Sequence, residues 1–141
     1  MKSVEEVLIK YNWPARTSKP TTAISEIENI IKFKLPDDYL IFAQNFLGSE
    51  TFIGQEFVRL WDFDELLTTN KDYQIFENLP RTLGIGGNGS SEFIAIEQTE
   101  SSKIRVVISP FIDLDKSYHI EIGDSFADFL NRLDHWEEWF K

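Results

Sequence analysis

The sequence predicts an α+β fold: a single domain, residues 1–141, in which a mainly antiparallel central sheet is packed by N-terminal helices and a C-terminal helix. With 141 residues, of which 42% are hydrophobic, the chain is long enough to bury a sizeable core. Apolar residues recur at helical spacing near both ends, whereas short β-rich segments occupy the middle. Because short strands come in adjacent runs, antiparallel pairing is favoured over a doubly wound sheet.

Two helices are predicted near the N-terminus. Apolar residues recur at helical spacing before Trp13 and again over residues 24–33, with a loop over residues 12–22 between them. Thr21 or Thr22 is positioned to cap the second helix, because a side-chain hydroxyl accepts a hydrogen bond from the first turn. The apolar positions are Val4, Val7, Leu8 and Tyr11 in the first helix and Ile24, Ile27, Ile30 and Ile31 in the second.

A third helix is predicted to begin at Pro36. Proline lacks only a donor that the first turn leaves unpaired, and Asp37 and Asp38 oppose the positive end of the helix dipole. Gly48 is positioned to end the helix. The residues expected to be buried together are Tyr39, Phe42, Ala43 and Phe46 of this helix and Ile27 and Ile31 of the preceding one.

The middle of the chain is predicted to form short strands. They cover residues 51–53, 57–60, 83–85, 93–96, 104–108 and 118–122. Asp62 or Asp64 is positioned to cap a short helix after the second strand, and residues 71–77 are ambiguous, since they can extend that helix. Asp124 or Ser125 is positioned to cap a final helix. Its apolar positions are Phe126, Phe129, Leu130, Leu133, Trp136 and Phe140.

The glycine-rich stretch over residues 84–91 has two interpretations. Its sequence, GIGGNGSS, is similar to a phosphate-binding loop. A P-loop needs Lys-Ser or Lys-Thr after its last glycine, however, and a dinucleotide site needs a helix there. Here Glu92 leads into a β-rich segment instead. A hairpin turn is therefore favoured, and no nucleotide or other cofactor is expected.

Residues that commonly bind metals or catalyse reactions are few. Cysteine is absent, and His119 and His135 are the only histidines, which excludes thiolate sites and a three-histidine metal site within one chain. The acidic runs at residues 62–65 and 113–115 lack the twelve-residue pattern of a calcium loop. His135 and Glu138 share a predicted helix face but supply too few ligands for a metal. A Gly-x-Ser-x-Gly motif of hydrolases is also absent. We therefore expect neither a metal site nor enzyme activity.

The charge of the chain points to its class of partner. Asp and Glu number 24 against 14 Lys and Arg, a net charge of −10. Such a surface repels nucleic-acid phosphates and speeds the encounter with a basic partner, although many proteins are acidic for solubility alone. No apolar run approaches the ~20 residues of a membrane span, and the first residues lack the apolar stretch of a signal peptide. We therefore expect a cytoplasmic protein that binds neither nucleic acid nor membrane.

Tryptophans beside carboxylates mark the candidate binding surface. Trp61, Trp136 and Trp139 stand among acidic residues, and such rings serve as anchors while the carboxylates pair with cations of a partner. The alternative is that each tryptophan is half-buried at the end of an amphipathic helix. The predicted partner-binding residues are Trp61, Asp62, Asp64, Glu65, Glu92, Asp113 and Asp115.

The order of the segments carries a family resemblance. A helix with two glutamates precedes LPDDY at residues 35–39, and a second helix follows that motif. A strand and short helix at residues 60–67, the glycine turn at residues 86–89 and IEIGDSFADFL at residues 120–130 then come in order. This set resembles the SUKH superfamily over residues 22–133.

The resemblance implies a non-enzymatic α+β domain that binds another protein. Many bacterial members are similar to immunity proteins, which bind and neutralise a cognate toxin, often a nuclease, whereas eukaryotic relatives are linked to cell-wall synthesis. We therefore expect an immunity protein for a basic toxin, with a regulatory or scaffolding interaction domain as the alternative. Two features depart from the family pattern: Leu47 replaces the usual Asn before Gly48, and the last helix is predicted to run past the usual end.

Overall fold

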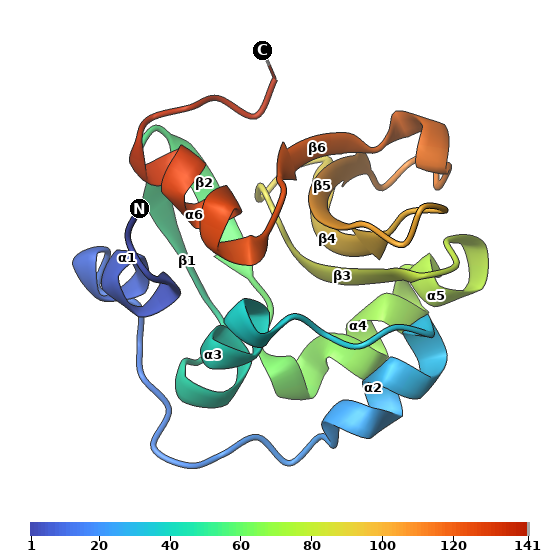
Figure 1. Ribbon diagram of the computed structural model, residues 1–141, viewed down its shortest axis with the longest axis horizontal. Helices are drawn as coiled ribbons and strands as arrows, with labels where there is room; N and C mark the ends of the chain where they lie inside the picture. Colours follow the sequence, from blue (N-terminus) through green and yellow to red (C-terminus); the bar gives the residue numbers. More distant parts are fainter. Residues whose placement is uncertain (141) are drawn as a thin grey trace.

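The computed structural model describes residues 1–140 and shows one curled, six-stranded sheet with helices packed against it (Figure 1). All neighbouring strands are antiparallel and lie side by side in sequence order. The strands are β1 (Ser49–Ile53), β2 (Glu56–Leu60), β3 (Thr82–Gly87), β4 (Glu92–Gln98), β5 (Ile104–Pro110) and β6 (Ile120–Gly123). The predicted α+β class with a mainly antiparallel sheet is confirmed.

Within residues 1–140, six α-helices and two short 3-10 helices flank or connect the strands. They are α1 (Val4–Lys10), α2 (Ile24–Ile31), α3 (Asp37–Asn45), α4 (Leu66–Asp72), α5 (Ile75–Asn78) and α6 (Phe126–Asp134), with η1 (Phe63–Glu65) and η2 (Lys116–Tyr118). Three helices thus precede the sheet and one follows it, as predicted. The ambiguous residues 71–77 contain the end of α4 and most of α5.

The start of α2 differs from the prediction, whereas α1 begins as its sequence indicates. Ser3 caps α1 through a bond from its first turn. Ala23, which has no capping side chain, stands at the N-cap of α2. The predicted cap by Thr21 or Thr22 is wrong, because their backbone N–H groups donate to the Asp64 carboxylate and so belong to a tertiary contact.

α3 and α6 both end earlier than predicted. α3 ends at Asn45, three residues before Gly48. α6 ends at Asp134, and the chain then turns away from the helix at Trp136, whose backbone is left-handed with φ of 65°. Phe140 therefore lies beyond the helix on which the periodicity had placed it.

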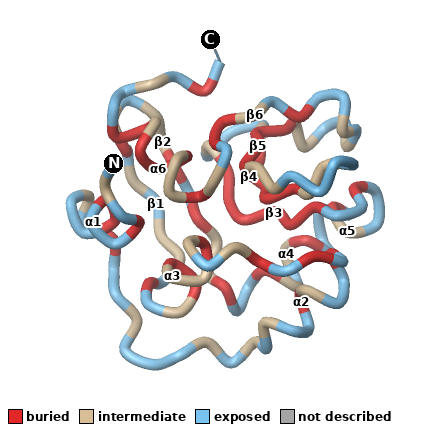
Figure 2. Tube along the Cα trace, viewed as in Figure 1, coloured by how far each residue is buried: buried red, intermediate tan, exposed pale blue. Residues whose placement is uncertain are grey.

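The main core lies between one face of the sheet and helices α1, α2, α3, α4 and α6. The buried segments of these elements are red in Figure 2. Tyr39 and Phe42 of α3 pack against Phe126 of α6, with ring centroids 5.2 to 6.0 Å apart. This burial joins the N-terminal helices to the C-terminal one. The predicted burial is confirmed for Tyr39, Phe42, Ala43, Phe46, Ile27 and Ile31.

A second, smaller cluster covers the opposite face of the sheet. It contains Phe93, Ala95 and Val107 from the strands and Ile75 and Leu79 from α5 and the residue after it. Successive strand residues point to opposite faces, so these side chains alternate with those of the main core. The partly buried residues at its rim are Trp61, Phe111 and Leu114. This rim positions the candidate site.

Candidate functional site

Three aromatic rings at the rim of the second cluster form a surface that we call the aromatic face: Trp61, Tyr73 and Phe111. Trp61 and Tyr73 are stacked, with centroids 6.0 Å apart and planes inclined by 11°, and Tyr73 lies 4.5 Å from Phe111. With Arg59 and Glu92 the rings line a small hollow of about 90 Å³ that opens to solvent. Tyr73 is exposed and the other two rings are half-buried. Large rings fixed by packing yet reachable from solvent are suited to anchor a protein partner.

Local structure at the ends of β2 and α4 brings two of these rings together. The Trp61 N–H donates to the Ile85 carbonyl at 2.9 Å, which fixes its backbone beside β3. The buried side-chain amide of Asn70 donates to the Gly84 carbonyl at 2.9 Å, and its oxygen accepts the Gly84 N–H at 2.7 Å. α4 is thereby tied to β3, and Tyr73, the residue directly after α4, lies against Trp61.

The glycine-rich stretch forms the hairpin between β3 and β4, as its favoured interpretation predicted. The side chain of Asn88 bonds to Glu92 across the turn at 2.7 Å. Gly89 has a positive φ of 76°, and a Cβ there would come within 2.8 Å of the Phe57 ring. Glycine at this position therefore serves backbone geometry and close packing.

Three of the predicted acids lie at or near the aromatic face. Glu92 lines the hollow, and Asp113 and Asp115 are exposed on the loop that begins at Phe111. Within residues 1–140, none of these three carboxylates forms an ion pair with Lys, Arg or His. The same loop carries Ile112, which is 93% exposed. The loop therefore presents an apolar side chain beside carboxylates that lack an internal cation.

The remaining predicted residues have other surroundings. The Asp62 carboxylate pairs with Arg16 at 2.7 Å, where both side chains are largely buried. Asp64 accepts backbone hydrogen bonds from the end of the loop over residues 12–22. Glu65 is exposed in η1. The structure thus divides the predicted set: Trp61, with Glu92, belongs to the aromatic face, whereas Asp62 and Asp64 fasten the N-terminal loop.

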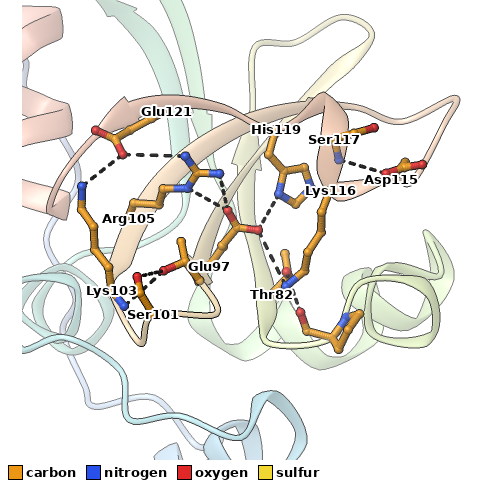
Figure 3. Close-up of polar contacts among 12 residues, drawn as sticks. Thr82, Glu97, Ser101, Lys103, Arg105, Asp115, Lys116, Ser117, His119 and Glu121 are labelled. Atoms are coloured by element: carbon orange, nitrogen blue, oxygen red, sulfur yellow. Dashed lines mark hydrogen bonds and ion pairs between the residues drawn. The ribbon is translucent and has the colours of Figure 1, made fainter.

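A buried carboxylate network, which the sequence analysis did not identify, lies under the loop between β5 and β6 (Figure 3). The Glu97 side chain is 3% exposed. One of its oxygens accepts the Arg105 Nε–H at 2.8 Å, the other is 2.7 Å from His119 Nδ1, and Lys116 Nζ is 3.9 Å from the latter oxygen. Burial raises the pKa of Glu97, but the bonds from His119 and Arg105 outweigh it, so the pKa lies below its usual value.

Glu97, His119 and Ser109 are the types of residue that form a hydrolytic triad, but all three are buried, which argues against that role. The Ser109 hydroxyl and His119 Nε2 have no hydrogen-bond partner among the described residues. Ser109 is 1% exposed and the His119 side chain is fully buried. A nucleophile must be reachable by its substrate, so in this arrangement the Glu97–His119 pair acts as a structural contact.

The C-terminal tryptophans have different environments. Trp139 is 6% exposed, its ring stacks on Phe129 with centroids 6.1 Å apart, and its backbone N–H donates to the Glu56 carboxylate at 2.8 Å. Trp139 is therefore a packing residue. Trp136 is 63% exposed.

In residues 1–140 no group of three or more His, Asp or Glu side chains is arranged to hold a metal ion. In the same part of the chain, no helix combines the length and apolar character that crossing a bilayer requires.

The family model described as SMI1 / KNR4 family (SUKH-1) matches residues 20–132. A search of curated proteins finds no significant match. The matched range contains the whole sheet and the aromatic face, and it leaves out α1 and the segment after α6.

Proposed function

The chain belongs to the SMI1 / KNR4 family (SUKH-1), and we propose that it is an immunity protein, a domain that binds a cognate basic toxin and neutralises it without catalysing a reaction. Family membership is consistent with a role in immunity or in regulatory protein interaction. The proposal further places the protein in the cytoplasm, where an immunity protein meets an incoming or newly made toxin.

One observation carries the proposal: aromatic rings and carboxylates without internal cations occur together on one surface. Trp61, Tyr73 and Phe111 pack against one another, so their positions are fixed before any partner arrives. Glu92 lies among them. Central aromatic anchors with charged groups around them are typical of tight protein interfaces.

The charge of the whole molecule supports a basic partner. A net charge of −10 attracts a protein that carries positive charge and raises the rate of their encounter. A toxin that acts on nucleic acid needs a basic surface to bind phosphates. An acidic protein seated on that surface would block substrate binding, and stoichiometric neutralisation follows without any catalytic group.

The proposal is tested by capture of the partner. The purified chain, immobilised by a tag, is incubated with a lysate of the cells that make it, and bound proteins are identified by mass spectrometry. We expect a basic protein, with a pI above about 9 if it acts on nucleic acid. The purified partner should be toxic when expressed alone and should lose its activity at one equivalent of this chain.

Matched variants locate the interface in the same experiment. Trp61→Ala and Glu92→Lys should lose the partner, whereas Glu100→Lys, an exposed acid at the opposite end of the β4–β5 hairpin, should retain it. If Trp61→Ala and Glu92→Lys both retain the partner, the interface lies elsewhere on the molecule. A partner that is not basic, or is harmless when expressed alone, would contradict the immunity proposal and favour a regulatory or scaffolding role.

A further inference from the structure

The loop between β5 and β6, residues 111–119, carries much of the proposed interface but little regular structure. Phe111 belongs to the aromatic face, and Ile112, Asp113 and Asp115 are exposed along the loop. Its only regular element is the three-residue η2. A loop of this kind is mobile unless side chains fix it, and a mobile loop loses conformational freedom when it binds.

Packing and one backbone bond fix the beginning of this loop. The Phe111 N–H donates to the Ser91 carbonyl at 3.0 Å. Its ring lies 5.1 Å from Phe93 of the second cluster, and Leu114 packs against the same cluster. Beyond Leu114 the loop does not pack against this cluster, and its last residues are held by polar contacts of Lys116 and His119.

A buried carboxylate fixes the end of the loop (Figure 3). The two oxygens of Glu97 contact different elements. Oε1 accepts hydrogen bonds from Arg105 of β5, whereas Oε2 contacts the loop, 2.7 Å from His119 Nδ1 and 3.9 Å from Lys116 Nζ. The Glu97 carboxylate thus joins the last residues of the loop to the sheet. Because the His119 side chain is fully buried, water is excluded from its contact with Glu97.

We propose that Glu97 is a positioning residue: its buried carboxylate holds the β5–β6 loop in place and thereby preorganises the surface that docks a basic partner. The docking part of this statement rests on the proposed function, whereas the positioning part does not. A buried carboxylate is costly unless it is paired and hydrogen-bonded, and here two of its three partners, His119 and Lys116, belong to the loop. Opening the loop would leave Oε2 of Glu97 buried without these partners, so the closed loop is the stable state.

The inference is tested by hydrogen–deuterium exchange at neutral pH. We compare the wild-type chain with Glu97→Gln, Glu97→Ala and His119→Gln. The matched control is Glu121→Gln, because Glu121 also contacts Arg105, at 3.8 Å, but has no ion pair with the loop. We expect amide exchange in residues 111–119 to rise at least about tenfold in Glu97→Ala and less in Glu97→Gln, which keeps a hydrogen-bonding oxygen. Strands β3 and β4 should stay protected.

The outcome separates positioning from general stability. Equal loop exchange in the wild-type chain and the variants overturns the inference, as does a rise shared by the loop and the whole sheet. If Glu97→Ala does not fold, His119→Gln decides the matter, since it acts from the loop side and leaves the Glu97–Arg105 bonds intact. The captured partner should also bind Glu97→Gln more weakly than the wild-type chain; equal binding overturns the docking part. Since the exchange experiment needs no partner, its failure is distinguishable from failure of the proposed function.

Discussion

Tyr39, the last residue of the LPDDY motif, has a buried hydroxyl with no hydrogen-bond partner among the described residues. Burial raises the pKa of this phenol, which therefore stays neutral. An unpaired buried hydroxyl costs free energy, whereas its ring packs against Phe42 and Phe126. We expect Tyr39→Phe to leave the free energy of unfolding unchanged or to raise it by about 1 kcal/mol, as measured by urea denaturation.

The matched comparison is Phe42→Ala, which removes a fully buried ring and should lower the free energy of unfolding by about 3–5 kcal/mol. A loss of more than about 1 kcal/mol in Tyr39→Phe would show that the hydroxyl has a partner, such as an ordered water.

Asp134 illustrates a charge whose role depends on tertiary structure. Its buried carboxylate accepts bonds from Lys10 at 2.7 Å, Lys2 at 2.9 Å and Tyr11 at 2.8 Å, and thereby joins the N-terminal segment to α6. The bond from Lys10, followed by those from Lys2 and Tyr11, lowers the pKa of Asp134 well below its usual value, against the opposing effect of burial. A carboxyl whose pKa falls on folding stabilises the native state above its unfolded pKa, and this contribution is lost as the pH falls.

Asp134→Asn should therefore reduce the free energy of unfolding at pH 7 by about 1–3 kcal/mol, the range for hydrogen bonds to a charged group. The difference from the wild-type chain should shrink as the pH falls below about 4, the usual unfolded pKa of Asp. Urea denaturation at pH 7 and pH 3 measures it, with Asp113→Asn as the control, since Asp113 is exposed. An Asp134→Asn effect that is independent of pH would contradict the electrostatic explanation.

Part of the site was predictable at the level of single residues. Trp61 and Glu92 were predicted and do line one hollow, because a tryptophan beside acids is a visible signal. Tyr73 and Phe111 were missed. Tyr73 lies in a segment whose structure was ambiguous. Phe111 follows a predicted strand, and local sequence does not reveal which distant rings it contacts. Glu97 was also missed, although alternation along β4 places it on the same face as Phe93 and Ala95.

At the scale of elements, the segment after α6 shows where periodicity fails. Apolar residues continue at helical spacing to Phe140, yet α6 ends at Asp134. Gly54, with φ of 62°, lets the β1–β2 hairpin approach the backbone of Leu133 closely. In the segment after α6, the Trp139 ring packs on Phe129. These are contacts between parts of the chain far apart in sequence, which local spacing does not reveal. Helix starts were easier to predict where a cap is local, as at Ser125 in α6.

Trp139→Ala tests whether this segment completes the core. The indole is 6% exposed, and removing a buried tryptophan costs about 3–5 kcal/mol, so we expect a loss near the lower end of that range for a residue close to the chain end. Thermal and urea denaturation measure it. Trp136→Ala is the control, since that side chain is 63% exposed and should change stability by less than about 0.5 kcal/mol. Equal effects of the two variants would show that the segment does not pack as described.

At the scale of the whole molecule, the order of elements was the most predictable property. Strands that follow one another without intervening long helices favour antiparallel neighbours, and the sheet has that order from β1 to β6. The curl of the sheet and the second cluster on its other face were not predictable from spacing, because both depend on how strands twist and on what covers them. The aromatic face lies at that second cluster, so its complete outline needed the structure.

The central claim is that the aromatic face captures a basic partner by electrostatic attraction and holds it by aromatic contact. The measurement that tests it most directly is the rate of association and dissociation of the purified partner at two salt concentrations. We compare the wild-type chain with Glu92→Lys, Trp61→Ala and the control Glu100→Lys. Between about 50 and 500 mM salt, association should slow by about tenfold or more while dissociation changes less.

Among the variants, Glu92→Lys should slow association more than Glu100→Lys does, because Glu92 lies in the hollow at which the partner arrives. Trp61→Ala should instead speed dissociation, since losing a central aromatic contact acts mainly on the bound state. Association that does not change with salt, or rates that are equal in the wild-type chain and both face variants, would contradict the account.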